Sequence, residues 1–312
     1  MIYRQLGKSG LRVSALGLGT NQFGGKVDEK SVAAIIHAAI DHGVNFIDTA
    51  DVYTGGRSEE AIGKAIAGRR DRVVLATKVA SRRGEGPNDY GASRQSIVAG
   101  VEASLRRLGT DYIDLYQIHR FDPYTPAEET MRALDDLVQS GKVRYIGASN
   151  YAAWQLCRAN DVAERYGWSQ FASVQPHYHM FERAIEKELV PYCQAFGVGI
   201  IPYFPLAGGF LTGKYRRGQA PPPGSRGESS SYVQQYFTER NFDILEELER
   251  FASERGRSVG ELAIAWLLAR PMVASVIAGV TSVAQLEANL KAVDWELARE
   301  EMDELERILS RS

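Results

Sequence analysis

The chain has 312 residues, a length that allows two domains or one large α/β barrel. Its 37 Lys and Arg nearly balance 39 Asp and Glu, and a formal net charge of −2 argues against a dedicated nucleic-acid-binding protein, which carries a strong positive excess. Hydrophobic residues make up 44% of the chain and charged residues 24%, so a sizeable core is available and global disorder is excluded.

Neither end of the chain nor its apolar runs are typical of a secreted or membrane protein. Residues 1–8 lack the apolar stretch of a signal peptide. The longest uncharged run, residues 189–213, is interrupted by Pro191, Pro202 and Pro205, which disfavours a single membrane-spanning helix. Two cysteines cannot make a disulfide scaffold in a chain of this length, so we expect no membrane association and a cytoplasmic setting.

Short β-branched apolar runs alternate with longer amphipathic segments along the chain. A hairpin is predicted over residues 2–6 and 11–14. Eight strands are predicted over residues 15–18, 45–48, 72–78, 113–119, 143–148, 172–175, 198–202 and 274–278. Helices are predicted over residues 29–42, 58–67, 93–108, 127–140, 151–166, 185–196, 242–268, 283–291 and 297–309. The segment 242–268 holds two helices, with a break near Gly256 and Gly260.

The order of these elements predicts the fold. Strand cores such as residues 73–76 are continuously apolar, as in parallel strands that are buried on both faces. Eight strands, each followed by helix, favour a TIM-type (β/α)8 barrel, with one domain over residues 1–312. A doubly wound open sheet is the structural rival. The dinucleotide fingerprint of such a sheet fails here, because Gln22 stands where the third glycine belongs after Gly17 and Gly19.

A long loop follows the seventh predicted strand. Residues 203–238 show no clear element, and residues 218–231 are rich in Pro, Gly and Ser. Loops of this length in compact folds are usually functional or disordered. In a barrel, a loop after a strand lies on the active-site face.

Polar residues stand where several predicted strands end. The strand over 45–48 ends in Asp48, with Tyr53 close behind it, and the next two strands end in Lys78 and His119. Each residue has an ordinary structural explanation: a helix cap, a surface aromatic, a solvated charge and a structural histidine. In a barrel, however, the C-terminal ends of the strands converge on one rim. Four such residues together therefore favour a shared pocket.

Several segments of the chain resemble the aldo-keto reductase family. They are FIDTADVY (46–53), GKVRYIGASN (141–150), YFPL (203–206) and LTGKY (211–215). The segment YHMF (178–181) is similar to the branch that contains the voltage-gated potassium channel β subunits and bacterial reductases of glyceraldehyde 3-phosphate. The resemblance runs from about residue 4 to residue 289. It implies that Asp48, Tyr53, Lys78 and His119 form the family's catalytic tetrad.

This resemblance implies an NADPH-dependent reduction of a small aldehyde or ketone by direct hydride transfer. Tyr53 would supply the proton, and because a phenol has a reference pKa of about 10, it needs help near neutrality. A nearby charged Lys78 favours tyrosinate and is expected to lower the pKa of Tyr53. Asp48 would keep Lys78 charged and fixed. His119 would donate a hydrogen bond to the substrate oxygen.

The resemblance also implies where the cofactor binds. Ser149, Asn150 and Gln175 match residues that bind the nicotinamide carboxamide, and Tyr203 matches an aromatic residue that stacks on the nicotinamide ring. The other positions expected at this end of the cofactor are Gly19, Thr20, Asn21 and Asp48.

The phosphates of the cofactor are expected along the long loop and after the last strand. The expected positions are Phe204, Pro205, Leu206, Ala207, Lys214, Arg226, Gly279, Thr281, Gln285 and Asn289. Residues 205–207 resemble a backbone cradle for the pyrophosphate, and the loop would act as a lid. Because Lys214 and Arg226 offer charge-assisted contacts to phosphate, NADPH is favoured over NADH.

Three positions depart from the family's pattern. Phe204 replaces the usual serine and removes a hydroxyl near the phosphates, and Ala288 replaces an acidic residue that commonly meets the adenine. Gln285 stands where many relatives have an arginine for the 2′-phosphate, although the channel-subunit branch also has glutamine.

Two other functions remain open on the sequence. The first is an NADPH-binding regulatory or sensor subunit, but the channel subunits have lost the histidine that stands here as His119. The second is a metal-dependent barrel hydrolase that uses His177 and His179, although zinc would need a third ligand. The partners that we expect are a small carbonyl substrate and, in the assembled protein, a possible second copy of the chain. Aromatic residues could line a substrate pocket or pack the loops; these are Phe121, Tyr124, Tyr232, Tyr236 and Phe237.

Overall fold

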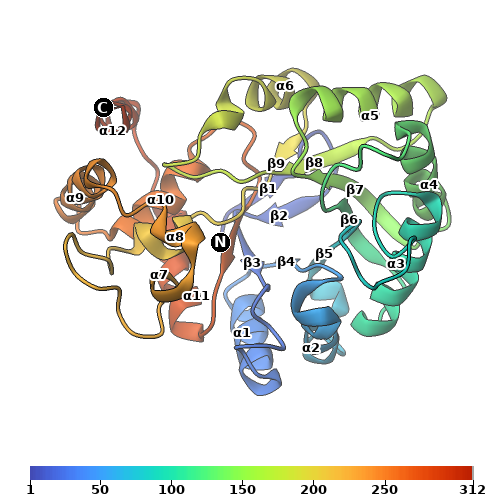
Figure 1. The fold of residues 1–312 in the computed structure, drawn as a ribbon, viewed down its shortest axis with the longest axis horizontal. Helices are drawn as coiled ribbons and strands as arrows, with labels where there is room; N and C mark the ends of the chain where they lie inside the picture. Colours follow the sequence, from blue (N-terminus) through green and yellow to red (C-terminus); the bar gives the residue numbers. More distant parts are fainter. Residues whose placement is uncertain (311–312) are drawn as a thin grey trace.

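A parallel eight-stranded sheet forms the centre of the computed structural model, which describes residues 1–310 (Figure 1). In sheet order its strands are β10 (Val276–Gly279), β3 (Leu16–Gly19), β4 (Phe46–Asp48), β5 (Val74–Val79), β6 (Ile113–Ile118), β7 (Val143–Ser149), β8 (Phe171–Gln175) and β9 (Gly199–Ile200). Isolated parallel bridges, Ile200 to Val273 and Tyr203 to Ile277, join the two edges of the sheet. The sheet therefore closes on itself, and the predicted barrel is confirmed.

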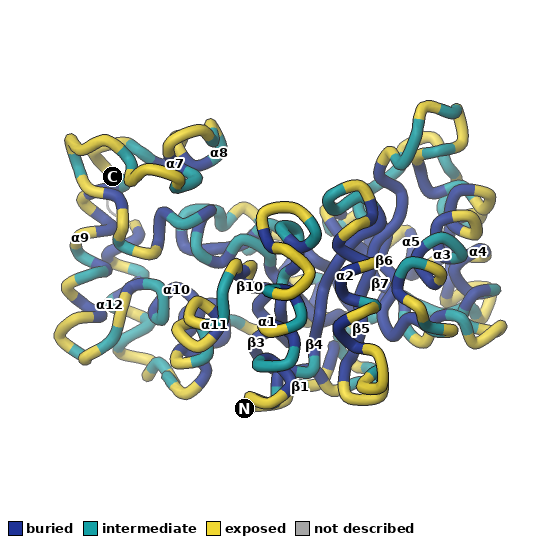
Figure 2. Tube along the Cα trace, turned by 90° about the horizontal axis from the view of Figure 1, so that it is seen from below, coloured by how far each residue is buried: buried dark blue, intermediate teal, exposed yellow. Residues whose placement is uncertain are grey.

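Helices alternate with the strands around the outside of the barrel, with their exposed faces turned outward (Figure 2). They are α1 (Glu29–Asp41), α2 (Arg57–Ala65), α3 (Arg94–Leu108), α4 (Ala127–Gln139), α5 (Ala153–Tyr166), α6 (Leu189–Phe196), α9 (Glu239–Ser253), α10 (Val259–Leu268), α11 (Val283–Leu290) and α12 (Arg299–Leu309). Single 3₁₀ turns are η1 (Tyr53–Gly56), η2 (Arg70–Arg72), η3 (Ala184–Glu186) and η5 (Lys291–Asp294).

Local sequence sets where these helices begin and end. The side chain of Ser93 accepts a hydrogen bond from the backbone N–H of Ser96 and caps α3, and Gly109 ends the helix at a φ of 62°. Gly256, at a φ of 67°, lies in the turn between α9 and α10. The break predicted near Gly256 and Gly260 is confirmed: α9 ends at Ser253, and α10 begins at Val259, where Ser258 caps it and Gly260 is its second residue.

An N-terminal hairpin closes one end of the barrel. Strands β1 (Tyr3–Gln5) and β2 (Arg12–Ser14) pair antiparallel, as the sequence predicts. Leu6 and Val13 pack in one buried cluster with Phe46, Leu115 and Ile201 of the barrel. In Figure 2 the N-terminus lies at the bottom, and α7 (Arg226–Ser229) and α8 (Ser231–Gln234) lie at the top. The hairpin thus leaves the opposite end of the barrel for a site.

The segment after β9 contains more structure than the sequence predicts. The expectation of no element between residues 203 and 238 is wrong, since this segment holds η4 (Ala207–Thr212), α7 and α8. The hydroxyl of Tyr215 accepts a hydrogen bond from the backbone N–H of Gly227 at 2.8 Å and so ties the start of α7 to the preceding loop. Across residues 1–310, no helix combines the length and the apolar character that a membrane crossing requires.

Candidate active site

Because side chains alternate along each strand, polar side chains from several strands meet inside the barrel. Successive side chains of a strand point to opposite faces, so Phe46 and Asp48 share the inner face of β4. Lys78 of β5 and Gln117 of β6 are partners in register. Asp48 Oδ1 accepts hydrogen bonds from Gln117 Nε2 at 3.0 Å and from Gln175 Nε2 at 2.8 Å. The carboxylate therefore has its charge satisfied from two further strands.

Lys78 lies at the centre of the predicted tetrad and is fully buried. Its Nζ donates to Asp48 Oδ2 at 2.6 Å, to the carbonyl oxygen of Thr49 at 2.7 Å and to Tyr53 Oη at 3.4 Å. Burial acts to lower the pKa of Lys78, but Asp48 and Tyr53 outweigh burial, and the pKa lies above its usual value. The ammonium therefore stays charged beside the phenol.

The pKa of Tyr53 differs from the sequence-based expectation. Burial raises the pKa of this phenol above its usual value and Asp48 adds to the rise, although Lys78 acts in the opposite direction. The predicted effect of Lys78 has the right sign, but the predicted net lowering is wrong because burial dominates. Tyr53 is consequently a neutral phenol near neutral pH and holds a proton that it can donate.

His119 lies beside Tyr53, with ring centroids 5.8 Å apart in an edge-to-face arrangement. Burial lowers the pKa of His119 to about 3, so its imidazole is neutral near pH 7. The hydroxyl of Ser81 lies 3.2 Å from Nδ1. If that hydroxyl donates, the ring proton is on Nε2, which is then available to a substrate oxygen. Ala80, at a φ of 85°, makes the turn that presents Ser81 to His119.

A cavity of about 1050 Å³ opens at this end of the barrel. Three members of the tetrad line it, and Lys78 lies behind them in the core. The predicted cofactor positions that line the cavity are Gly19, Thr20, Asn21, Asp48, Ser149, Asn150, Gln175, Tyr203, Phe204, Pro205, Leu206, Lys214, Arg226, Gly279, Thr281, Gln285 and Asn289. Ala207 is the exception, because it is buried beneath the cavity wall and does not line it.

Hydrogen bonds fix the cavity wall next to the tetrad. Asn150 Nδ2 donates to the carbonyl oxygen of His119 at 2.9 Å, and Tyr203 Oη donates to Asn150 Oδ1, also at 2.9 Å. Ser149 Oγ donates to the carbonyl oxygen of Gln175 at 2.9 Å. These contacts connect β6, β7, β8 and the segment after β9 across the rim, so the wall is a preformed surface.

Two residues of this wall and one buried residue next to it have strained backbone. Asn150, Phe204 and Ala207 have φ values of 55°, 56° and 50°, in the left-handed region that residues other than glycine rarely adopt. Such strain costs on the order of 1 kcal/mol or more per residue and clusters at functional sites. Here it turns the backbone of residues 204–207 along the cavity.

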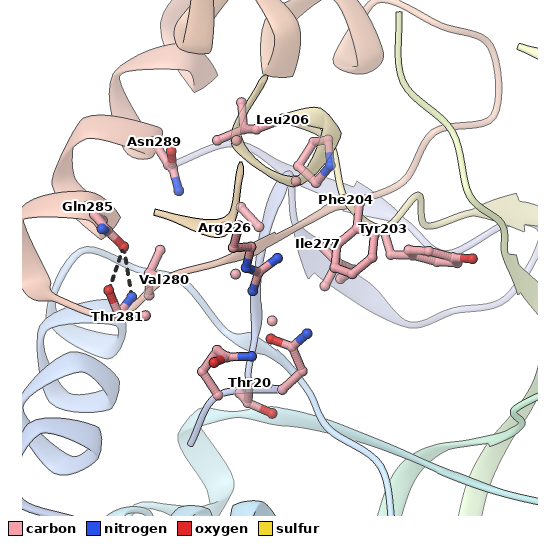
Figure 3. A pocket seen from close by; sticks show the side chains of 18 of the residues that line it. Thr20, Tyr203, Phe204, Leu206, Arg226, Ile277, Val280, Thr281, Gln285 and Asn289 are labelled. Carbon is pink, nitrogen blue, oxygen red and sulfur yellow. Dashed lines mark hydrogen bonds between the residues drawn. The ribbon is translucent and has the colours of Figure 1, made fainter. Parts of the chain in front are cut away.

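The other end of the cavity is lined by the guanidinium of Arg226 and the carboxamide of Gln285. Arg226 of α7 points into the space between Thr281, Thr20 and Phe204 (Figure 3), and its guanidinium lies 5.7 Å from the Phe204 ring centroid. Gln285 Oε1 accepts hydrogen bonds from the backbone N–H of Thr281 at 2.8 Å and from its hydroxyl at 3.1 Å. The carboxamide NH₂ of Gln285 has no part in either bond.

Sequence reasoning missed Gln117 and Ser81. A signal for Gln117 was present, because it is two residues before His119 on a strand and therefore lies on the same face. Ser81 follows Ala80, a residue with positive φ, in a loop, and no local sequence pattern predicts its contact with His119. Among the expected pocket aromatics, Tyr124 is 83% exposed, and Phe121 packs on Tyr151 instead of lining the large cavity.

His177 and His179 do contact each other, with their Nε2 atoms 3.1 Å apart. Within residues 1–310, no group of three or more His, Cys, Asp or Glu side chains is arranged to hold a metal ion.

Comparison with known proteins agrees with this geometry. Residues 15–310 match the model of the aldo/keto reductase family. A probable voltage-gated potassium channel subunit beta from Arabidopsis thaliana is 42% identical over 306 residues, which cover 94% of this chain and 92% of that protein. An uncharacterized oxidoreductase, YrpG, from Bacillus subtilis is 40% identical over 318 residues (96% and 93%). A versiconal hemiacetal acetate reductase from Aspergillus parasiticus is 36% identical over 332 residues (98% and 96%).

Proposed function

The chain belongs to the aldo/keto reductase family, and we propose that it is an NADPH-dependent reductase of small aldehydes or ketones, with Tyr53 as the proton donor. One observation carries this proposal: the buried chain Asp48–Lys78–Tyr53 ends beside His119 at the wall of one large cavity. Phenol, ammonium and neutral imidazole together are the groups that protonation of a carbonyl oxygen requires.

The residues around the cavity fit a nicotinamide dinucleotide. A volume of about 1050 Å³ is at the upper end of the range for small-molecule sites, roughly 300–1,000 Å³. Lys214 and Arg226 offer positive charge, and Phe204 and Leu206 carry backbone N–H groups in the cavity wall that could donate to a pyrophosphate. We propose that Asn150, Gln175 and Tyr203 hold the nicotinamide near Tyr53. When bound, NADPH supplies the hydride for the carbonyl carbon.

The chain's own residues supply the proton and the orientation. His119 Nε2–H and Tyr53 Oη–H both donate to the carbonyl oxygen, which positions the substrate and polarises its C=O bond. As negative charge develops on that oxygen, the proton leaves Tyr53 Oη. Lys78, 3.4 Å from Oη, then stabilises the tyrosinate, and Asp48 keeps Lys78 in place. The product is the alcohol.

The direct test is oxidation of NADPH by the purified protein with a panel of aldehydes and ketones, compared between wild type and Tyr53→Phe. We expect Tyr53→Phe to lower kcat by at least about 10²-fold, as loss of a general acid does, while the Kd of NADPH changes little. Tyr192→Phe is the matched control, because it removes a hydroxyl 3.4 Å from Asn160 and outside the cavity. Full turnover by Tyr53→Phe would refute the assignment.

A second candidate is a cofactor-binding regulatory or sensor subunit with little catalysis. The names of the Arabidopsis relative and of a 40% identical rice protein, also a probable voltage-gated potassium channel subunit beta, favour it. This alternative predicts tight NADPH binding with no turnover on any carbonyl in the panel.

The metal-dependent hydrolase finds no comparable support. Reduction by the proposed mechanism needs no metal, so we expect a chelator to leave the rate unchanged, and a chelator-sensitive rate would revive that hypothesis.

We further propose that the whole chain acts as one reductase domain in a reducing compartment such as the cytoplasm. Cys157 and Cys193 are both free, which suits such a compartment.

A further inference from the structure

Four polar side chains form a closed ring next to the cavity, on the side of Tyr203 and Phe204. His177 and His179 follow β8, whereas Tyr232 and Tyr236 come from α8 and the turn after it. Tyr232 Oη lies 2.5 Å from His177 Nε2, and Tyr236 Oη lies 3.2 Å from His179 Nε2. The two Nε2 atoms are 3.1 Å apart, and the two hydroxyls are 3.4 Å apart. We call these four residues the His–Tyr ring.

The backbone determines the direction of the hydrogen bonds in the His–Tyr ring. The N–H of Phe181 donates to His179 Nδ1 at 3.2 Å, so the ring proton of neutral His179 is on Nε2. Tyr236 Oη donates to Tyr232 Oη. Tyr232 in turn donates to His177 Nε2 and so occupies its one lone pair, which leaves Tyr236 Oη as the acceptor of His179 Nε2–H. Both tyrosine hydroxyls and His179 Nε2–H therefore have an acceptor within the ring.

Burial makes the hydrogen bonds of the His–Tyr ring costly to break. His179 is fully buried and Tyr236 is 6% exposed. Burial lowers the pKa of both imidazoles, that of His179 to about 3, so both are neutral near pH 7. A buried polar group that loses its partner bears the cost of desolvation. Separation of α8 from the barrel therefore leaves the imidazoles without these partners, and the ring favours the closed position of α8.

The His–Tyr ring also contacts the part of the cavity wall that the proposed function assigns to the nicotinamide. His177 stacks on Tyr203, with centroids 5.3 Å apart and planes 10° apart. Tyr232 packs on Phe204 at 5.3 Å. A Cβ on Gly208 would lie 2.8 Å from Val233 Cγ2, so α8 rests directly on η4. The same residues thus pack α8 against the barrel and fix the orientation of the Tyr203 ring.

We propose that His177, His179, Tyr232 and Tyr236 are positioning residues that fasten the segment after β9 over the cavity and thereby slow the release of the cofactor. This role rests on the proposed function for the cofactor itself. The fastening of the segment is a property of the chain alone and can be measured without any cofactor.

The first experiment is limited trypsin digestion of the cofactor-free protein. Candidate cleavage sites within the segment follow Lys214, Arg216, Arg217 and Arg226. The variant Tyr232→Phe/Tyr236→Phe removes both hydroxyls and keeps both rings. We expect cleavage within residues 214–226 to be faster by about tenfold, as loss of two hydrogen bonds would give. Tyr192→Phe is the control for loss of a hydroxyl elsewhere. Equal cleavage rates in the double variant and wild type would overturn the proposal.

The second experiment is stopped-flow measurement of NADPH release. We expect faster release and a higher KM for NADPH in Tyr232→Phe/Tyr236→Phe, with kcat unchanged or raised. A general loss of folding would instead lower kcat, so the KM-against-kcat split separates positioning from damage. Faster cleavage together with wild-type NADPH release would overturn the link to the cofactor. If the wild-type protein binds no NADPH, the proposed function fails, while trypsin digestion alone still decides whether the ring fastens the segment.

Discussion

Replacement of Asp51 with Asn removes a buried charge that the fold leaves poorly compensated. Asp51 is 4% exposed, and neither carboxylate oxygen has a hydrogen-bond partner within residues 1–310. The nearest cationic group is Arg83, whose Nε lies 3.7 Å from Oδ2. Burial, with a further contribution from Glu59, raises the pKa of Asp51 to about 7, against the opposing effect of Arg83.

The size and sign of the effect follow from this pKa. Between the ordinary value of 3.8 and about 7, the folded state keeps a proton that the unfolded state has released. The free energy of unfolding therefore contains a contribution that is fully present below the unfolded pKa and is lost as pH rises through the folded pKa. At about 1.4 kcal/mol per pH unit, the loss reaches up to about 4 kcal/mol above pH ~8. Asn at position 51 carries no charge, so the variant does not lose this stability at high pH.

The assay is urea denaturation of wild type and Asp51→Asn at about pH 5 and about pH 8.5, chosen to lie on either side of the folded pKa. Because about pH 5 already lies above the ordinary pKa of 3.8, we expect the stability of the variant relative to wild type to grow by about 3 kcal/mol between the two pH values, out of a full effect of about 4 kcal/mol. The exposed Asp161 provides a matched control, Asp161→Asn. A stability difference between Asp51→Asn and wild type that does not change with pH would refute the reasoning.

Three further predictions concern the site itself. Asp48→Asn breaks the buried ion pair with Lys78, and urea denaturation should show a loss of about 3–5 kcal/mol. Arg226→Ala should raise the Kd of NADPH, followed by fluorescence titration, by about tenfold, and that of NADH by less, since a charge-assisted bond contributes about 1.5–3 kcal/mol; an equal effect on both cofactors would contradict a contact with the extra phosphate. Ser81→Ala should lower kcat severalfold without a change in the Kd of NADPH, because His119 loses the partner that sets its tautomer; unchanged kcat would exclude that role.

The fold and the tetrad could be predicted because both depend on short-range patterns. Apolar runs and helical periodicity identify the alternating elements. Parallel strands place their C-terminal ends on one rim, so Asp48, Lys78 and His119 could be grouped by their position at strand ends alone. The structure confirms that the sheet closes and adds that Gln117 joins the group through its register with Lys78.

What the sequence could not predict depends on contacts between distant segments and on burial. His177 and Tyr232 are 55 residues apart, and nothing local in either segment indicates that they meet. Helices α7 and α8 have four residues each, too few for a hydrophobic period to appear. The net rise in the pKa of Tyr53 follows from desolvation, which no motif encodes.

Asp48 and Asp51, three residues apart, are both buried but differ in their hydrogen-bond partners. Asp48 accepts three hydrogen bonds, from Lys78, Gln117 and Gln175, so both of its oxygens are engaged in holding Lys78 and the barrel interior in place. Asp51 has no such partners and keeps its proton up to a pH of about 7. An acid that donates to a carbonyl must hold its proton before the reaction and be stabilised as an anion afterwards. Burial meets the first requirement at Tyr53, and Lys78 meets the second. The raised pKa of the resting phenol therefore agrees with proton donation: a lowered value would leave part of the protein as tyrosinate, without a proton to give.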